Sequence, residues 1–411
     1  MKANLECPRY QTLLMMKLTL TLFLCSLTFS AAEDWRQFRG PSGSGYTKSS
    51  IPEKPEVAWS LDLPGKGLSS PIIVGEHVYL TSSSGASQER LHVFCFKASD
   101  GAKVWERQFF STGRTMCHDK TAVAAPTPVS DGKRILALFS SNDLFCLDLE
   151  GNVLWLRGLT NDYPNASNSL GLASSPIIAD GVFIAHVEND SESFAAGIEL
   201  EAGKNLWKKD RTKRANWTSP IVVKGADGKE LAALQGSKGV DVVDPKTGAV
   251  VWRYDEGAST IPSSAADAQG NLYIPSNGLT AVKPRKDGKS EQLWRNAGMR
   301  PGTASPLVQE AKVFVITNAN VLTCGDLESG ARVWRMRLEG PIGGSPVAND
   351  SNLYAFSEKG LFQVVQLGEE KGEVIHTVDL GEVIQCTPAV ADEALYVRSN
   401  GRLWKLGKAQ G

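Results

Sequence analysis

The sequence predicts an all-β fold, an eight-bladed β-propeller in which a strand near the N-terminus closes the last blade. Three observations lead to this prediction. A tryptophan recurs with a regular period, an apolar opening run recurs with the same period, and each period holds four short strand-like runs. Four strands in a repeat of about 40 to 50 residues are typical of a propeller blade, so eight such repeats predict eight blades.

Each repeat opens with a short apolar run that starts at a serine or threonine, usually followed by proline. These runs start at Ser70, Thr127, Ser175, Ser219, Ser263, Ser305, Ser345 and Thr387. The intervals between them are 57, 48, 44, 44, 42, 40 and 42 residues. Proline is tolerated at the start of a strand because its missing N–H is not needed in the ladder there. Each opening run therefore predicts the first strand of a blade.

The second and third strands follow as β-branched or aromatic runs, as at residues 182–184 and 144–147. A turn comes next, as at residues 244–248, where glycine supplies the positive φ of a tight hairpin. The fourth strand carries the recurring tryptophan. The tryptophans that lie four residues after a glycine are Trp105, Trp155, Trp207, Trp252 and Trp334. Trp294 has the same place after a longer turn, and His376 replaces tryptophan in the next repeat. We expect these tryptophans to be structural.

The two ends of the chain predict how the ring closes. The last repeat ends at residues 401–406, which resemble a third strand, whereas residues 57–60 resemble a fourth strand with no blade before it. If residues 57–60 complete the eighth blade, no sheet edge stays open there. The predicted propeller spans residues 57–407, after an N-terminal extension over residues 33–56 and before a tail over residues 408–411.

The first residues have the pattern of an export signal. Residues 18–29 are almost wholly apolar, Lys17 precedes them, and small residues up to Ala32 follow. An apolar run of about 12 residues is too short to cross a membrane. We expect residues 1–32 to be a signal peptide, with Met15 or Met16 as an alternative start, and the protein to be periplasmic or extracellular. Cys25 follows a leucine and not a small residue, so we expect no lipid anchor.

The charge balance argues against nucleic acid as a partner. The chain has 44 basic and 45 acidic residues, and removal of residues 1–32 leaves 41 and 44, a net charge of −3. No basic surplus is available to neutralise a phosphate backbone. Five cysteines remain, an odd number that leaves at least one thiol outside any disulfide within the chain. They are Cys95, Cys117, Cys146, Cys324 and Cys386.

Two groups of residues are expected to pack and not to react. Cys95, Cys146 and Cys324 occupy one equivalent position before their tryptophans, where Gly197 and Val242 stand in other repeats. A small buried residue explains all five. The histidines that lie in strand patterns are His77, His92 and His186, and we expect them to be structural as well.

The repeat, with its Ser-Pro opening and its Asp-x-x-x-Gly-x-x-x-Trp turn and strand, resembles the PQQ-like β-propeller repeat over essentially the whole chain after residue 32. Residues 34–41, Asp-Trp-Arg-Gln-Phe-Arg-Gly-Pro, resemble the start of exported bacterial proteins with this propeller. The resemblance implies one of two functions. The quinoprotein dehydrogenases bind pyrroloquinoline quinone and calcium, whereas the BamB-type scaffold of outer-membrane assembly has eight blades and no cofactor.

The chain departs from the dehydrogenases in its shorter length, in its lack of adjacent cysteines, and in the lack of an assignable Glu/Asn/Asp calcium set. It departs from the BamB type in lacking a lipid-site cysteine. Size and repeat number favour the scaffold type. We therefore expect a non-catalytic binding protein without a cofactor, whose partner is a protein, peptide or polysaccharide. The alternative is a quinone- or metal-dependent oxidoreductase, so enzymatic activity stays an open question.

A ligand of a propeller is expected where the loops from fourth to first strands meet. The early loops of this kind are long and polar, and long ordered loops on a rigid scaffold often bind ligands. We expect them to form a polar funnel. The candidate ligand-binding residues are Cys117, His118, Lys120, Asp162, Asn165, Asn168, Arg211, Arg214, Asn216, Trp217, Arg300 and Gln385. Cys117 and His118 could also be a packed thiol and a hydrogen-bonded histidine, and the cationic residues near Trp217 could simply be solvated.

Overall fold

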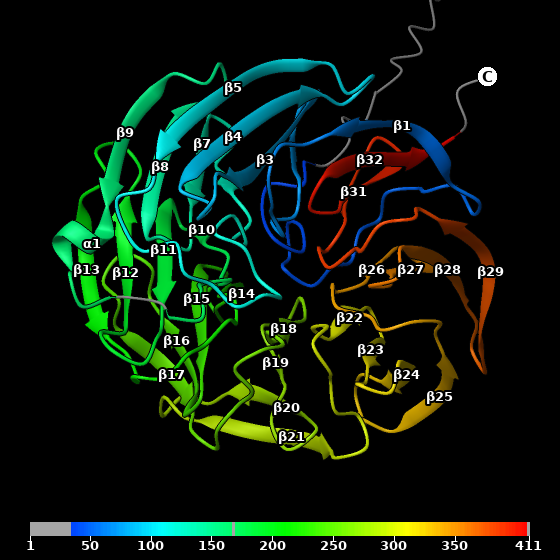
Figure 1. Ribbon diagram of the computed structural model, residues 1–411. Coiled ribbons are helices and arrows are strands. Elements are labelled where there is room, and N and C mark those ends of the chain that lie inside the picture. Colours follow the sequence, from blue (N-terminus) through cyan, green and yellow to red (C-terminus); the bar gives the residue numbers. More distant parts are fainter. Residues whose placement is uncertain (1–33, 167–168, 409–411) are drawn as a thin grey trace, which may run out of the picture. The chain divides into compact units, whose positions relative to one another are not determined.

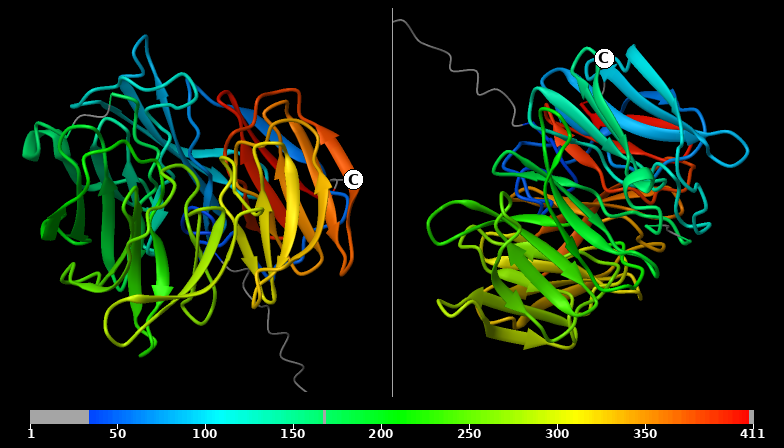
Figure 2. Two further views of the ribbon diagram at one scale, coloured as in Figure 1. Left: turned by 90° about the horizontal axis from the view of Figure 1, so that it is seen from below. Right: turned by 90° about the vertical axis from the view of Figure 1, so that its left-hand side faces the viewer.

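A computed structural model describes residues 34–166 and 169–408. These residues form eight four-stranded antiparallel sheets arranged as the blades of a β-propeller (Figure 1). Figure 2 shows the same blades from two further directions. First strands of neighbouring blades contact one another around the axis, and the contact between β2 and β30 closes the circle. The predicted all-β, eight-bladed propeller is confirmed.

The first four blades follow one another along the chain. Blade 1 consists of β2 (Ile72–Val74), β3 (His77–Ser84), β4 (Arg90–Lys97) and β5 (Lys103–Phe110). Blade 2 consists of β6 (Val129–Ser130), β7 (Arg134–Leu138), β8 (Asp143–Asp148) and β9 (Val153–Gly158), and the single helical turn α1 (Leu159–Asp162) follows it. Blade 3 consists of β10 (Ile177–Ala179), β11 (Val182–Val187), β12 (Phe194–Glu199) and β13 (Asn205–Asp210). Blade 4 consists of β14 (Ile221–Lys224), β15 (Glu230–Gly236), β16 (Gly239–Val243) and β17 (Val250–Tyr254).

The remaining blades complete the ring. Blade 5 consists of β18 (Ala265–Ala266), β19 (Leu272–Ile274), β20 (Leu279–Pro284) and β21 (Ser290–Asn296). Blade 6 consists of β22 (Leu307–Gln309), β23 (Lys312–Ile316), β24 (Val321–Asp326) and β25 (Arg332–Arg337). Blade 7 consists of β26 (Val347–Ala348), β27 (Asn352–Phe356), β28 (Leu361–Leu367) and β29 (Gly372–Asp379). Blade 8 consists of β30 (Ala389–Ala391), β31 (Ala394–Arg398), β32 (Arg402–Gly407) and β1 (Glu56–Asp62).

Blade 8 joins the two ends of the propeller as the sequence predicts. Its outer strand β1 comes from the beginning of the propeller, and its other three strands come from the end. β1 runs antiparallel to β32, with Trp59 opposite Lys405 and Ser60 opposite Trp404. The ladder covers the edge that β32 would otherwise expose, so the ring closes through backbone hydrogen bonds and not by packing alone.

The recurring tryptophans other than Trp252 join neighbouring blades through their indole N–H groups, as expected of structural residues. The indole N–H of Trp207 donates to the carbonyl of Pro245 in the next blade over 2.7 Å, and equivalent bonds start at Trp59, Trp105, Trp155, Trp294 and Trp334. The ring of Trp207 lies on Gly248, where a Cβ would come within 2.6 Å of the indole and φ is +67°. Glycine in the turn therefore permits both the hairpin and the docking of the indole.

The cysteines of the repeat lie opposite these tryptophans. Cys95, Cys146 and Cys324 are buried, and each pairs across the ladder with the tryptophan of its own blade, after which the register shifts. Their expected packing role is confirmed, and burial raises the pKa of the Cys95 and Cys146 thiols to about 12. His376, in the tryptophan place of blade 7, has its Nε2 3.1 Å from the carbonyl oxygen of Pro55.

An N-terminal segment, residues 34–47, crosses one end of the channel. Trp35 exchanges two backbone hydrogen bonds with Ile73 of blade 1, and Thr47 donates its N–H to Ala348 of blade 7 over 2.9 Å. These partners lie toward the turns between first and second strands, at the end opposite to the loops that join one blade to the next. The segment therefore covers the far end of the channel.

Arg39 anchors the middle of the N-terminal segment. Its side chain is buried, and its guanidinium donates to the carbonyl oxygens of Ser264 (2.9 Å), Ser44 (3.2 Å) and Pro306. Burial lowers the pKa of Arg39 to about 9, so the group is still a cation at neutral pH. The cation is held by the backbones of blades 5 and 6, because carbonyl dipoles replace the water that burial removes.

The signal peptide and the cleavage after Ala32 lie outside the described residues, as does the end of the predicted tail. Among the residues that the structure describes, no helix has the length and apolar character that crossing a membrane requires. The outer strand β1 begins at Glu56, so the propeller ladder spans residues 56–407.

Candidate functional site

A ring of hydroxyl groups lines the channel. The Ser or Thr that opens a blade accepts, through its side-chain oxygen, the backbone N–H of the corresponding residue in the preceding blade. The seven donor–acceptor pairs, at 2.9–3.0 Å, are Ser70 to Thr127, Thr127 to Ser175, Ser175 to Ser219, Ser219 to Ser263, Ser263 to Ser305, Ser305 to Ser345 and Ser345 to Thr387. First strands have no neighbouring strand on the channel side, so these hydroxyls satisfy backbone groups that a ladder would otherwise satisfy.

The ring is open at one point, between blade 8 and blade 1. The Oγ of Ser70 is buried and has no hydrogen-bond partner among the described residues. The other seven hydroxyls each accept a hydrogen bond, and none of them donates one to another described residue. Their O–H groups are therefore left to donate into the channel.

A cavity of about 380 Å³ occupies the channel above this ring. All seven hydrogen-bonded hydroxyl residues line it, together with Phe38 of the N-terminal segment. Its volume lies within the range of small-molecule sites. The loops that join one blade to the next line its mouth, and the N-terminal segment covers the opposite end of the channel, so a ligand enters from the loop side.

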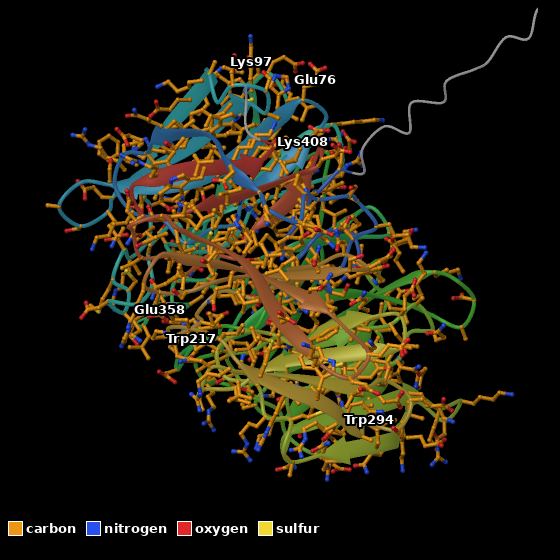
Figure 3. The ribbon with its side chains drawn as sticks, turned by 90° about the vertical axis from the view of Figure 1, so that its right-hand side faces the viewer. Glu76, Lys97, Trp217, Trp294, Glu358 and Lys408 are labelled. Carbon is orange, nitrogen blue, oxygen red and sulfur yellow. The ribbon has the colours of Figure 1, made fainter. Side chains whose placement is uncertain are left out.

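Four of the sequence-predicted site residues meet at this cavity. They are His118, Lys120, Trp217 and Gln385. The Nζ of Lys120 lies 4.0 Å from an oxygen of Glu358, in the turn between β27 and β28, so the pair links the loop before blade 2 to blade 7. Trp217 and Glu358 lie on the same side of the propeller (Figure 3). The apolar side chains of Leu170 and Ile261, both exposed, complete the mouth.

Trp217 is held in place from two sides. Its indole N–H donates to the carbonyl of Gly171 over 3.1 Å, and its backbone N–H donates to Thr260 over 2.8 Å. The residue is partly buried, and its ring forms part of the cavity wall. A fixed aromatic face of this kind can stack on a planar or apolar ligand group at little cost in conformational entropy.

Two predicted residues, Arg211 and Asn216, support the loop of Trp217 and do not line the cavity. Arg211 Nε donates to Glu188 over 2.7 Å, and Asn216 donates to the other oxygen of Glu188 over 2.9 Å. His186 Nε2 lies 2.9 Å from the same carboxylate. Although burial opposes ionisation, His186 and Arg211 hold the pKa of Glu188 at about 2. This buried, ionised cluster fixes both ends of the loop before blade 4.

The other predicted residues lie elsewhere. Asp162 forms an ion pair with Arg157 beside blade 3. Arg300 lines a separate cavity of about 380 Å³ with Glu256. Asn165, Arg214 and Cys117 lie outside the channel cavity too: Asn165 and Arg214 are exposed, the carbonyl of Asn165 accepts hydrogen bonds from Ser191 and Glu192, and the Cys117 thiol accepts one from Gln88 over 3.5 Å. Asn168 is outside the described residues.

Sequence reasoning missed the hydroxyl ring, Phe38, Leu170, Ile261 and Glu358 as parts of the site. The recurring Ser or Thr at each opening is the signal that could have revealed the ring, because each repeat has one small hydroxyl residue at the start of the strand that faces the axis. No pattern in the sequence indicates Phe38 or Glu358. Neither belongs to a loop between blades, and only the fold brings them to the cavity.

Metal ligands are not grouped in the described part of the chain, where no cluster of three or more His, Cys, Asp or Glu residues is placed to hold an ion. The cavity wall carries a single carboxylate, Glu358, and two basic groups, His118 and Lys120. Calcium prefers six to eight oxygen ligands, several of them carboxylates. Pyrroloquinoline quinone carries three carboxylates, and two basic groups are too few to pair with all three. The wall therefore does not fit a quinone–calcium pair.

Comparisons with known proteins agree with the fold. A family model described as outer membrane protein assembly factor BamB matches residues 51–214, 92–286, 236–324 and 319–411. Two curated relatives are polyvinylalcohol dehydrogenases, one from a Pseudomonas species at 22% identity and one from Sphingopyxis sp. (strain 113P3) at 21%. The matches cover 54% and 78% of this chain and 35% and 52% of those proteins. The chain thus spans about a third to a half of the length of these relatives.

Solved structures of both functional types share the architecture. BamB from Moraxella catarrhalis matches with a TM-score of 0.62 at 15% identity, covering 87% of this chain and 99% of that chain. A europium-containing methanol dehydrogenase matches with a TM-score of 0.70 at 12% identity, covering 91% and 98%. The quinohemoprotein alcohol dehydrogenase of Comamonas testosteroni matches with 0.65 at 12%, covering 92% and 81%. At these identities the likeness shows the fold alone.

Proposed function

Because the chain belongs to the family described as outer membrane protein assembly factor BamB, we propose that it is an exported binding propeller that receives a partner in its channel cavity. The observation that carries this proposal is the make-up of the cavity wall. A ring of hydroxyl donors, a fixed aromatic face and a few charged groups at the mouth suit recognition. The wall offers no nucleophile–base pair and no metal-ligand cluster for chemistry.

The wall indicates the kind of group that would enter. The hydroxyl ring donates hydrogen bonds to acceptors such as sugar hydroxyls, peptide carbonyls or a carboxylate. Trp217, Leu170 and Ile261 add an apolar rim. A chain end or a side group of a peptide or a polysaccharide meets both requirements, because such groups combine acceptors with an apolar part.

Binding to defined probes tests the proposal. The full chain would be titrated against a panel of oligosaccharides and a displayed library of short peptides, with Trp217→Ala as the test variant and Arg300→Ala as the control in the separate cavity. We expect at least one probe class to bind, Trp217→Ala to weaken its Kd at least tenfold, and Arg300→Ala to leave it unchanged. No binder in either panel, or an equal loss in both variants, would contradict the proposal.

The competing proposal is a quinone-dependent oxidoreductase. Its support is the likeness to proteins named as dehydrogenases, and its weakness is the cavity wall described above. Incubation with pyrroloquinoline quinone and calcium, followed by gel filtration, separates the two proposals. We expect no stoichiometric chromophore to stay with the protein. A bound chromophore with dye-linked alcohol oxidation would replace the binding proposal.

Export is part of the proposal and has its own measurement. The family description refers to the outer membrane, and the pattern of residues 17–32 is typical of a secretory signal. Mass spectrometry of the protein recovered from the exported fraction of a bacterial host should find Glu33 as the first residue. Recovery only from the cytosol, with residues 1–32 intact, would count against export.

A further inference from the structure

Blade 1 holds a second cluster, separate from the channel cavity, that combines a hydroxyl, an imidazole and a carboxylate. Ser84 is the last residue of β3, His92 lies on β4, and Glu106 lies on β5. In the ladders Ser84 pairs with Arg90, and Glu106 pairs with Phe94. His92 lies two residues from each of these partners on the same strand, so all three side chains share one face of the sheet. Three neighbouring strands therefore present one continuous line of hydrogen-bonding groups.

The distances along this line are those of direct hydrogen bonds. Ser84 Oγ lies 2.7 Å from His92 Nε2, and His92 Nδ1 lies 2.9 Å from Glu106 Oε1. The hydroxyl and the carboxylate are thus on opposite nitrogens of one imidazole. A nucleophile bonded to a base that a third group orients is the geometric signature of an activated serine.

The carboxylate decides which nitrogen of His92 carries the proton. Although partial burial opposes ionisation, bonds from Lys103, His92 and Gln108 lower the pKa of Glu106 to about 2. Glu106 is therefore an anion that only accepts hydrogen bonds. The proton of neutral His92 must then lie on Nδ1, which leaves a lone pair on Nε2 to accept the O–H of Ser84.

The ring of His92 is also held by packing. Its side chain is almost fully buried, and it stacks on Phe94 with an interplanar angle of 1° and a centroid distance of 5.6 Å. Ser84, by contrast, is only half-buried. A fixed base beside a reachable hydroxyl is the arrangement that acyl transfer needs, because the base then requires little reorganisation.

We propose that Ser84, His92 and Glu106 form a serine-hydrolase triad that cleaves carboxylic esters with a short apolar acyl group. Ser84 is the nucleophile, His92 the general base and acid, and Glu106 the positioning residue that acts through His92.

A cleft of about 460 Å³ beside the triad indicates the substrate. His92 and Glu106 line the cleft, whereas Ser84 reaches it only through its hydrogen bond to His92. The apolar part of the wall consists of Leu61, Pro64, Phe94 and Phe96, and the polar part consists of Asp62, Lys103 and Gln108. Leu61 and Pro64 come from β1 and the residues after it, so the cleft lies in the seam between blade 8 and blade 1. An apolar wall beside a buried base favours a short hydrocarbon acyl group over a charged one.

The reaction balances with water as the second reactant. The Oγ of Ser84 forms a bond to the ester carbonyl carbon while its proton passes to His92 Nε2. His92 then gives this proton to the leaving alkoxide as the C–O bond breaks, which releases the alcohol and leaves an acyl-serine. Water, deprotonated by His92, attacks the acyl carbon, and the proton returns to Ser84 as the carboxylic acid leaves.

The residue after Ser84 offers a group for the negative oxygen of the intermediate. In other serine hydrolases the N–H that follows the nucleophile is such a donor. The backbone N–H of Gly85 has no hydrogen-bond partner in the described part of the chain. It is therefore available for this role.

The test labels the full chain with a fluorophosphonate probe and locates the adduct by mass spectrometry. We expect one adduct per chain on Ser84, its loss in Ser84→Ala, and full labelling in Ser87→Ala, whose serine is exposed in the next turn. Hydrolysis of p-nitrophenyl butyrate should fall with the labelling. No adduct on the wild-type protein, or an adduct on another serine that survives Ser84→Ala, would overturn the proposal.

A second pair of variants separates positioning from folding. Glu106→Gln keeps the size of the side chain and removes its charge, and we expect it to slow labelling by at least a hundredfold. Glu106→Asp should restore labelling to within about tenfold of the wild type, because the charge returns. Equal rates in the two variants, with unchanged circular dichroism, would show that the carboxylate has only a structural role.

Discussion

Single side-chain groups in this protein satisfy backbone hydrogen-bonding atoms that a neighbouring strand satisfies in most sheets. Seven hydroxyls and six indole N–H groups satisfy backbone atoms across the boundaries between blades. Within residues 34–166 and 169–408 each backbone ladder lies inside one blade, although single backbone bonds such as that from Arg253 N–H to Gly288 also cross a boundary. Adhesion between blades therefore depends largely on these polar groups and on the apolar faces around them. Residues that look repetitive in the sequence are therefore the contacts that make the ring rigid.

Replacement of a docked tryptophan should be costly. Trp207→Ala removes a buried indole and its bond to Pro245, and we expect a loss of about 3–5 kcal/mol in the free energy of unfolding. Trp217→Ala, at the partly open mouth, is the matched control, with an expected loss of roughly 1–2 kcal/mol. Urea unfolding followed by circular dichroism measures both losses. Equal losses would show that a docked tryptophan contributes no more to the free energy of unfolding than one at the mouth of the cavity.

The buried Glu188 should make stability depend on pH. Its pKa is about 2 in the fold against 4.5 for the free side chain, so its contribution is complete above about pH 4.5 and disappears as the pH falls toward 2. We expect Glu188→Gln to lower the free energy of unfolding by about 3 kcal/mol at pH 7. The gap between the two proteins should narrow from pH 5 to pH 3.

Urea unfolding at pH 7, 5, 4 and 3 measures this gap. Glu291→Gln is the control for Glu188→Gln, because Glu291 pairs with Lys283 in an exposed position and should contribute less than about 1 kcal/mol. A gap that stays constant over the whole pH range would contradict the assignment of an ionised, buried Glu188.

At the scale of elements, the seam between blade 8 and blade 1 differs from the other seven boundaries. It lacks the eighth link of the hydroxyl ring, and Arg398 spans it instead. The guanidinium of Arg398 is buried and donates to Thr81 of blade 1 (2.5 Å), to Ser399 (2.7 Å) and to Asn400 (2.9 Å). Burial lowers the pKa of Arg398 to about 10, so it still acts as a cation. A buried arginine thus links blade 8 to blade 1 at the boundary where the hydroxyl link is missing.

Removal of this arginine should loosen the ring. Arg398→Met leaves three carbonyl oxygens without a donor, and we expect a loss of about 3 kcal/mol or more. Arg402→Met, on the next strand with an exposed partner in Asp62, should cost less than about 1 kcal/mol. Thermal unfolding of the two variants measures the difference. Equal melting temperatures would mean that the seam does not depend on Arg398.

At the scale of the whole molecule, the beginning of the chain closes the propeller twice. The N-terminal segment crosses the channel end from blade 1 to blade 7, and β1 then completes blade 8. Both closures join residues that are distant in sequence, so each must overcome the entropy cost of closing a long loop. The result is a channel cavity open to partners from the loop side.

The N-terminal segment should come loose when its anchor is removed. Arg39→Ala deletes the bonds to blades 5 and 6, and we expect proteases to cleave within residues 34–47 at least tenfold faster while blade 1 stays protected. Arg36→Ala is the control, because its side chain is about half exposed. Cleavage rates measured by mass spectrometry decide the matter, and equal rates in the two variants would contradict the anchoring role.

Much of the fold could be predicted because its signals are local. The period of the tryptophans predicts eight blades, and the surplus strand at residues 57–60 predicts the closure. The candidate site was predicted less completely: His118, Lys120, Trp217 and Gln385 do meet at the cavity, whereas Arg211 and Asn216 instead support the loop of Trp217. A polar residue in a loop has the same appearance in a sequence whether it faces a ligand or a buried carboxylate.

The sequence alone determined what each repeat is, since hydrophobic periodicity, turn glycines and docking tryptophans act within some 50 residues. Only the tertiary structure decided what happens between repeats. It set Phe38 and Glu358 at the cavity, aligned the hydroxyls into a ring and left the Oγ of Ser70 without a hydrogen-bond partner among the described residues. It also brought Ser84, His92 and Glu106 into one line. Which side chains face each other depends on strand register and on the closing of the ring, and both are long-range consequences of packing that no local pattern records.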